Sequence, residues 1–228
     1  RNRRIGCSVS GIAQFITNRG IDELRTWLEE GYNTIQDWDK EYSDWFAIPK
    51  SIKTTSVKPS GTVSLLAGAT PGLHYPESRF YTRRIRLSIN SELVEPLKKA
   101  GYKIEPAFGS EESTLVVEIP VDVGEGIRTA SELTIWEQFS IAAFLQRHWA
   151  DNQVSCTVTF DPEKEGEQIP HVLNYYQYHL KGISLLPRHD YGAYKQMPYE
   201  AIEEKEYNKQ VKKLGKLSFG VIKNEEAE

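Results

Sequence analysis

The chain has 228 residues, of which 39% are hydrophobic and 26% charged, and its formal net charge is −4 at pH 7. This composition predicts a globular protein with a substantial core, in one large domain or two small ones. The negative net charge disfavours nucleic-acid binding that is mainly electrostatic. No apolar stretch approaches the roughly 20 residues that span a bilayer. We therefore expect a cytoplasmic protein with no direct nucleic-acid or membrane partner.

Two cysteines, Cys7 and Cys156, lie far apart in the sequence. They form neither a disulfide framework nor a metal-ligand spacing, so we expect no metal site. Both are predicted to be small buried residues rather than reactive thiols. The chain begins at Arg1 without a methionine and ends in a polar stretch, which favours a fragment of a longer protein.

The first half of the chain alternates helical and extended patterns. Residues 12–18 and 21–45 are predicted to be helices, because apolar and aromatic side chains recur at helical spacing. Residues 52–57 are rich in β-branched side chains and predict a strand, followed by a tight loop and a short helix that ends at Gly68. A second strand is expected over residues 81–89.

The second half continues this alternation. We expect helices over residues 92–100, 134–149 and from 170 to 182, and strands over 114–119, 154–160 and 183–186. Thr134 and Glu137 match a capping box, and the helix that they open is apolar around most of its girth, so it should be buried. The order of elements predicts an α/β fold with a largely parallel sheet, either open or part of a barrel.

The segment Lys58-Pro59-Ser60-Gly61-Thr62 joins the first strand to the short helix. Unpaired amides and the peptide dipoles at a helix N-terminus suit a phosphate. Gly61 would let the backbone approach an anion, and the hydroxyls of Ser60 and Thr62 could donate to it. The same residues also fit an ordinary turn with a capped helix, so the local pattern leaves both interpretations open.

Other motifs narrow the chemistry. The segment lacks the Gly-Lys-Ser/Thr of a Walker loop and the three spaced glycines of a dinucleotide fingerprint, which argues against a common NTPase. The five histidines have no triad context. His74 is the histidine nearest the candidate phosphate loop, and it becomes a candidate ligand contact.

Taken together, the motifs resemble the adenosylcobalamin-dependent (class II) ribonucleotide reductases. The matching segments, in the order of that family, are residues 3–6, 10–11, 51–64, 68–76, 149–155, 157–160 and 184–187. The triphosphate-reducing, monomeric branch is the most similar, because His74-Tyr75-Pro76 stands where other branches usually carry an acidic residue.

This resemblance implies a ten-stranded α/β barrel, of which residues 1–200 would form the C-terminal part and residues 201–228 a polar extension. It implies deoxyribonucleotide synthesis by thiyl-radical chemistry, started by cleavage of the cobalt–carbon bond of adenosylcobalamin. The implied partners are a ribonucleotide substrate and thioredoxin or a similar dithiol, which restores the oxidised cysteine pair.

The resemblance also implies site residues. Pro59, Ser60, Gly61 and Thr62 match the substrate-phosphate loop of the family, and Thr70, Pro71, Gly72 and His74 form a possible substrate or cofactor loop. Neither Cys7 nor Cys156 matches a radical or shuttle cysteine of the family. We therefore expect no catalytic residue in this chain, and we expect the isolated chain to be inactive and marginally stable, with unpaired strand edges.

Two other functions remain open. The first is a non-catalytic nucleotide- or phosphate-binding α/β domain that acts as a regulatory or structural subunit. Such a domain could retain the phosphate-binding loop without catalysing a reaction. The second alternative is a reductase branch that acts on diphosphates without cobalamin. The sequence leaves open whether the substrate is a diphosphate or a triphosphate.

Overall fold

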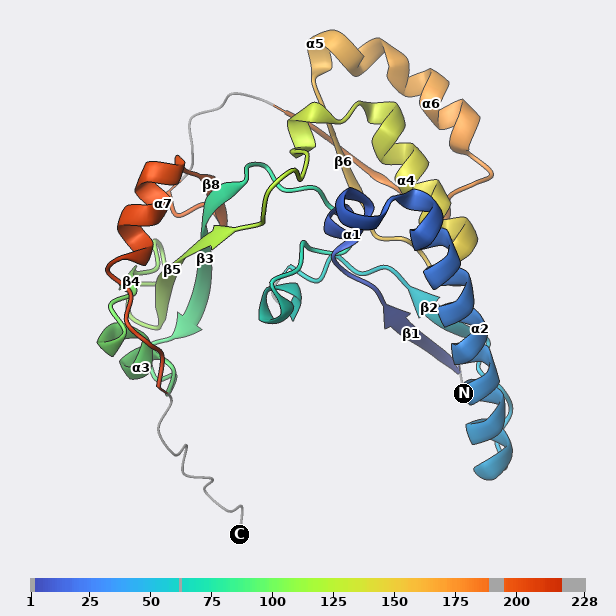
Figure 1. The fold of residues 1–228 in the computed structure, drawn as a ribbon, viewed down its shortest axis with the longest axis horizontal. Helices are drawn as coiled ribbons and strands as arrows, with labels where there is room; N and C mark the ends of the chain where they lie inside the picture. Colours follow the sequence, from blue (N-terminus) through green and yellow to red (C-terminus); the bar gives the residue numbers. More distant parts are fainter. Residues whose placement is uncertain (1–2, 62, 189–194, 219–228) are drawn as a thin grey trace. The chain divides into compact units, whose positions relative to one another are not determined.

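The computed structural model describes residues 3–61, 63–188 and 195–218. They belong to two compact units, each built from two stretches of chain (Figure 1). The first unit comprises residues 1–77 and 123–190, and the second comprises residues 78–122 and 191–228. The domain boundary that the sequence places near residue 200 stays a prediction.

The first unit contains parallel strands. They are β1 (Arg4–Ser8), β2 (Lys53–Ser56), β6 (Thr157–Phe160) and β7 (Ser184–Pro187). β1 pairs with β2 and β6 pairs with β7, both in parallel, and a parallel bridge between Val57 and Val154 joins the two pairs. Because these strands run the same way, their carboxyl ends lie at one edge of the sheet. This unit has the parallel α/β arrangement that the sequence predicts.

Helices make the connections between these strands (Figure 1). They are α1 (Ile12–Arg19), α2 (Ile21–Trp45), α4 (Ile135–His148), α5 (Pro162–Glu165) and α6 (Ile169–Tyr176), with short 3-10 turns at η1 (Val63–Ala67), η2 (Ala130–Glu132) and η3 (Gly166–Gln168). The buried face of α4 carries Phe139 and Leu145, which belong to one apolar cluster with Val158 of β6 and Val172 of α6. This cluster is the core of the first unit.

The predicted capping box at the start of α4 is present. The Thr134 hydroxyl accepts a hydrogen bond from the amide of Glu137, and the Glu137 carboxylate accepts one from the amide of Thr134. Hydrogen bonds from the Arg128 guanidinium and from Thr134 lower the pKa of Glu137 to about 2. The helix therefore begins where the sequence predicts it to begin.

The second unit is an antiparallel sheet with two helices. Its elements are β3 (Phe80–Ser88), α3 (Val94–Lys99), β4 (Lys103–Pro106), β5 (Thr114–Asp122), β8 (Tyr199–Ala201) and α7 (Glu204–Val211). The strand order is β4-β5-β3-β8, and every pairing in it is antiparallel. The expectation that the strands near residues 81–89 and 114–119 belong to a parallel sheet is therefore wrong.

The content of the connection between β3 and β5, rather than its length, explains this difference. A parallel pair needs a crossover of a dozen or more residues that packs across the sheet. Between β3 and β5 the chain forms only the six-residue helix α3 and the short strand β4, which itself pairs with β5. Alternation of strands and helices in the sequence cannot distinguish such a return from a true crossover.

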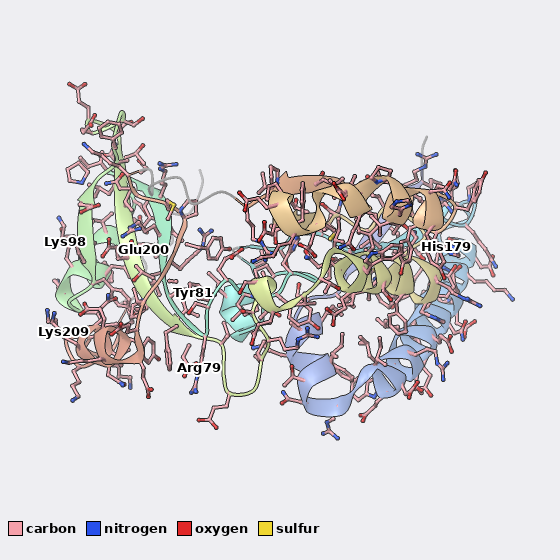
Figure 2. All side chains as sticks on the ribbon, turned by 90° about the horizontal axis from the view of Figure 1, so that it is seen from above. Arg79, Tyr81, Lys98, His179, Glu200 and Lys209 are labelled. Carbon is pink, nitrogen blue, oxygen red and sulfur yellow. The ribbon has the colours of Figure 1, made fainter. Side chains whose placement is uncertain are left out.

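A charged network crosses the sheet of the second unit. Arg84 on β3 lies 2.9 Å from Glu118 on β5 and also pairs with Glu200 on β8, which Figure 2 labels. Lys103 on β4 lies 3.1 Å from the same Glu118 carboxylate. Because Glu118 is buried, its charge depends on these two cations, and the network links all four strands.

Some elements differ from the sequence prediction. The strands β1, β4 and β8 and the helix α7 were not predicted, and α7 falls in the stretch expected to be a polar extension. The predicted helix over residues 92–100 shortens to α3, as Pro96 within it would suggest. Short strands such as β1 carry too few residues for their periodicity to stand out.

Asp151 and Asn152, which precede β6, tie β1, β2 and α2 of the first unit together. The Asn152 side-chain amide donates to the carbonyl of Ile5 on β1 (2.9 Å) and to that of Thr55 on β2 (2.8 Å). The Asp151 carboxylate accepts hydrogen bonds from the amide and hydroxyl of Thr54 and from the hydroxyl of Tyr32 on α2. Two consecutive residues before β6 therefore set the register of its neighbours.

We predict that Asp151→Asn lowers the free energy of unfolding by about 1 to 2 kcal/mol at pH 7, since it weakens these charge-assisted hydrogen bonds. Burial opposes ionisation, but the hydrogen bonds from Thr54 and Tyr32 hold the pKa of Asp151 below its usual value. The stabilisation is present above the unfolded pKa of about 3.9 and is lost as pH falls through the lower folded value.

Urea denaturation at pH 7 and at pH 3 measures this effect. The difference between wild type and Asp151→Asn should shrink at pH 3. Asp22→Asn on α2 is the matched control, because the Asp22 side chain is 92% exposed and its loss should change stability little at either pH. An equal difference at both pH values would contradict the assigned role of Asp151.

Candidate functional site

Loops meet beyond the carboxyl ends of β1 and β2. They are loop 1 (residues 9–11, after β1), loop 2 (residues 57–61, after β2) and loop 3 (residues 68–74, after η1). The amide of Gly11 donates to the carbonyl of Thr70 (2.9 Å), and the amide of Lys58 donates to the Ser8 hydroxyl (2.9 Å). The carboxyl edge of a parallel sheet is where α/β proteins bind ligands. The three loops are therefore the candidate site.

Ser60 is the centre of this arrangement. Its backbone φ is +34°, a conformation that residues other than glycine rarely adopt. Its hydroxyl accepts a hydrogen bond from the amide of Gly72 (2.9 Å) and lies 2.6 Å from the Ser10 hydroxyl. One hydrogen lies between the two hydroxyls, so the Ser10–Ser60 pair retains one hydrogen for a ligand. Ser60 thus joins all three loops.

The described part of loop 2 after Val57 is open to solvent, whereas Val57 itself is buried. Pro59 is exposed, and Ser60 and Gly61 are half-buried. Thr62, the fourth predicted phosphate-binding residue, lies outside the described residues. The helix that follows is only η1, a single 3-10 segment of five residues. The dipole expected from this helix is therefore weak. An anion site at loop 2 would depend mainly on the polar groups of the loops themselves.

Gly72 holds loop 3 against loop 2. Its φ is +52°, and a Cβ atom placed on it would lie 2.4 Å from the carbonyl oxygen of Lys58. No side chain fits at that distance, so only glycine permits the two backbones to approach. This contact also sets the position of the Gly72 amide that donates to Ser60.

His74 connects loop 3 to β6 through its ring nitrogens. Its Nε2 accepts a hydrogen bond from the amide of Thr157 (3.3 Å), and its Nδ1 lies 3.3 Å from the carbonyl of Pro71. The contact with Pro71 requires the hydrogen on Nδ1, which fixes the neutral tautomer. Burial lowers the pKa of His74 below its usual value. Both ring nitrogens are therefore occupied by the protein.

Gln14 on α1 binds loop 3, and sequence reasoning did not find it. Its Oε1 accepts from the amide of Thr70 (2.8 Å), while its Nε2 donates to the carbonyls of Gly68 (2.9 Å) and Val123 (3.3 Å). These two carbonyl acceptors lie 54 and 109 residues away in sequence. No local pattern could have indicated the contact.

The two cysteines differ in environment. Cys156 is buried, as predicted, and burial raises its pKa to about 12, so the thiol stays protonated at neutral pH. A protonated, buried thiol is a poor nucleophile. Cys7 was predicted to be buried, and that prediction is wrong: it is exposed on β1. The reason is that all five residues of β1 are exposed, so the described residues leave the faces of this strand uncovered.

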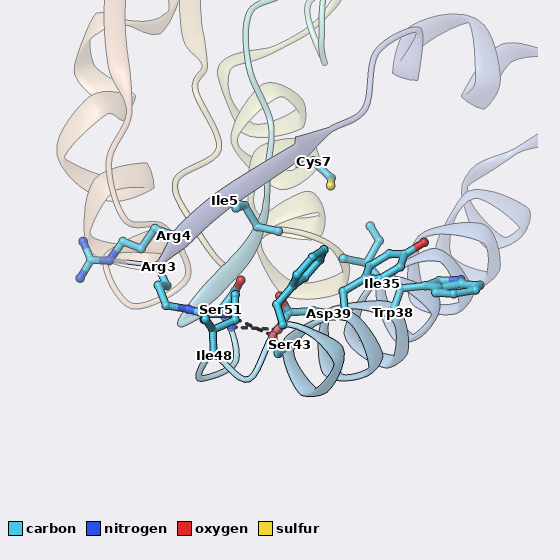
Figure 3. A pocket seen from close by; sticks show the side chains of 12 residues that line it. Arg3, Arg4, Ile5, Cys7, Ile35, Trp38, Asp39, Ser43, Ile48 and Ser51 are labelled. Atoms are coloured by element: carbon cyan, nitrogen blue, oxygen red, sulfur yellow. Dashed lines mark hydrogen bonds between the residues drawn. The ribbon is translucent and has the colours of Figure 1, made fainter. Parts of the chain in front are cut away.

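Cys7 lies beside an apolar cavity of about 640 Å³ between β1 and the end of α2 (Figure 3). Ile5, Trp38, Tyr42 and Phe46 line it, and Phe46 is 70% exposed. Exposed aromatic side chains gathered at one place are typical of a contact surface rather than of a solvated face.

Within the described residues, no group of three or more histidine, cysteine, aspartate or glutamate side chains could hold a metal ion. No helix in that part of the chain is long and apolar enough to cross a membrane.

The chain matches no family model. It is 61% identical over 214 residues to the adenosylcobalamin-dependent ribonucleoside-triphosphate reductase of Euglena gracilis, covering 94% of the chain and 29% of that protein. It is 37% identical over 237 residues to the Levilactobacillus brevis protein of the same name, covering 91% of the chain and 31% of that protein. The crystal structure of a B12-dependent (class II) ribonucleotide reductase superposes with a TM-score of 0.81 at 34% identity, over 95% of the chain and 34% of that structure.

These similarities place the chain among the class II ribonucleotide reductases. Within this class it belongs to the adenosylcobalamin-dependent ribonucleoside-triphosphate reductase family, which confirms the resemblance seen in the motifs. The chain spans about three tenths of the length of the curated relatives that it matches.

We predict that Cys156 takes no part in chemistry. In the native, full-length protein, Cys156→Ala should retain most turnover, because it removes only a small packed group. Mass spectrometry after brief alkylation should find Cys156 unmodified in the native state and modified in urea. Loss of all activity in a normally folded variant would show the assignment to be wrong.

Proposed function

We propose that this chain is the part of an adenosylcobalamin-dependent ribonucleoside-triphosphate reductase that receives the substrate phosphates at loop 2. The observation that carries the proposal is the position of loop 2. It lies at the carboxyl edge of parallel strands, with Lys58 and Pro59 exposed, and Ser60 joins it to loops 1 and 3. The names of the relatives supply the reaction and the substrate class.

The groups of loop 2 suit a triphosphate. The Ser10–Ser60 pair retains one hydroxyl hydrogen, and Gly61 has no side chain to keep a phosphate from the backbone. Lys58 is exposed. A lysine ammonium provides the point charge that phosphate sites commonly use. We assign Pro59, Ser60 and Gly61 to phosphate binding, with Thr62 by position.

Loop 3 contacts both of the other loops of the proposed site. Thr70 and Gly72 contact loop 1 and loop 2 through their backbones, and His74 is held neutral between Pro71 and β6. We therefore propose that loop 3 shapes the substrate pocket, with its own side chains turned to the protein.

In the complete protein, a ribonucleoside triphosphate and a dithiol would give a deoxyribonucleoside triphosphate, a disulfide and water. Bound adenosylcobalamin would supply the radical that starts this reaction. Cys156 is buried and protonated, and Cys7 lies beside an apolar cavity, so this chain contributes binding and positioning. We assign no cobalt ligand among the described residues.

The remaining parts of the proposal concern the whole protein. The parallel strands of the first unit would belong to a ten-stranded barrel, which accounts for the uncovered edge of β1 and the exposed aromatic residues beside it. Thioredoxin or a similar dithiol would reduce the oxidised cysteine pair. Residues 1–200 would belong to the barrel and residues 201–228 to a C-terminal extension.

The reaction itself is the first test. The complete polypeptide, incubated with CTP, adenosylcobalamin and dithiothreitol, should form dCTP, detected by mass spectrometry. Omission of adenosylcobalamin should abolish the product. A protein that binds CTP without forming dCTP would instead be the non-catalytic binding domain, and product without cobalamin would indicate the other reductase branch.

Loop 2 is tested by Gly61→Val in the complete protein. The added side chain should hold the phosphates away from the backbone and raise the KM for CTP about 30-fold, equivalent to roughly 2 kcal/mol, while the fold is retained. Gly166→Val is the control, because a Cβ atom at Gly166 meets no other atom within 4 Å. An unchanged KM in Gly61→Val would refute the assignment.

A further inference from the structure

Gln14 uses its whole side-chain amide on backbone groups. The oxygen accepts from Thr70, and the nitrogen donates to Gly68 and Val123. An amide turned the other way would place its nitrogen against the amide of Thr70, so the orientation is fixed by its partners. The residue is half-buried on α1, and both ends of the amide are occupied by protein. A phosphate oxygen, which accepts hydrogen bonds, could bind the amide nitrogen only by displacing the carbonyl of Gly68 or Val123.

The contacts continue from Gln14 to the phosphate loop. Gln14 holds loop 3 at Gly68 and Thr70, and two residues further on Gly72 donates its amide to the Ser60 hydroxyl. The Cβ position of Gly72 is only 2.4 Å from the Lys58 carbonyl, so the two backbones are in contact and a shift of loop 3 must move loop 2. Ser60 holds a backbone conformation with positive φ, which persists only where its surroundings impose it.

We infer that Gln14 is a positioning residue for the substrate phosphates: it holds loop 3, and through Gly72 it fixes Ser60, without touching the substrate. This inference rests on the proposed function of loop 2. It also gives a role to the bond with Val123, the first residue after β5. That bond ties loop 3 to the point where the chain returns to the first unit.

The test uses the complete reductase with CTP as substrate. Gln14→Leu keeps a similar volume but removes all three hydrogen bonds. It should raise the KM about tenfold, while kcat changes less than about threefold, because the lost interaction serves substrate binding. Gln14→Glu keeps the acceptor for Thr70 but removes both donors, so it should raise the KM in the same direction. This second variant decides the matter if Gln14→Leu does not fold.

A double-mutant cycle with Ser60→Ala separates positioning from general destabilisation. If Gln14 acts through Ser60, the double variant should have nearly the KM of Ser60→Ala alone. Gln146→Leu is the matched control. Gln146 binds backbone groups of Ala150, Asn152 and Val154 with the same kind of amide, but at the amino end of β6. Its loss should lower stability and leave the KM unchanged.

The outcomes are distinct. If Ser60→Ala leaves the KM unchanged, the proposed phosphate role of loop 2 fails. If Ser60→Ala raises the KM but Gln14→Leu does not, or if the two effects multiply independently, only the inference about Gln14 is overturned. A KM increase in Gln146→Leu equal to that in Gln14→Leu would also overturn it, since both would then reflect stability.

Discussion

The first unit depends on the hydrogen bonds that Asn152 makes to two neighbouring strands. One side-chain amide reaches the carbonyls of Ile5 and Thr55, while the adjacent Asp151 carboxylate binds Thr54 and Tyr32. These bonds hold β1 and β2 to the segment before β6, and loops 1 and 2 follow directly from the carboxyl ends of the two strands. The candidate phosphate site exists because β1 and β2 end side by side.

Several glutamine side chains of the first unit bind backbone groups through both ends of their amides. Gln14 binds loop 3, Gln138 binds the amide and carbonyl of Thr159 on β6, and Gln146 binds the turn before β6. A glutamine on a helix can satisfy both a donor and an acceptor of an irregular backbone segment without adding charge. These bonds satisfy backbone groups that have no partner within regular secondary structure.

The candidate site and the titratable groups around it differ in character. Polar groups gather at loop 2, where the Ser10–Ser60 pair retains a hydrogen and Lys58 is exposed. Two titratable groups are held in unreactive protonation states. Burial keeps the Cys156 thiol protonated, and the hydrogen bonds of His74 to loop 3 and β6 keep its ring neutral. A reductase segment of this kind would hold the substrate while reactive groups act from elsewhere in the polypeptide. The apolar cavity beside β1 is consistent with contact to such a region.

The sequence alone determined the features that depend on local patterns: the long helix α2, the capping box of α4, the strand and loop around Ser60, and the family itself. Only the tertiary structure decided the antiparallel pairing of β3 with β5, the exposure of Cys7 and the clamp made by Gln14. These depend on residues far apart in the chain, and local propensity carries no information about which distant backbone groups will meet. The hydroxyl of Ser60 illustrates the difference, because sequence identifies it as a donor for phosphate, whereas its bond to Gly72 exists only once two loops have been folded together.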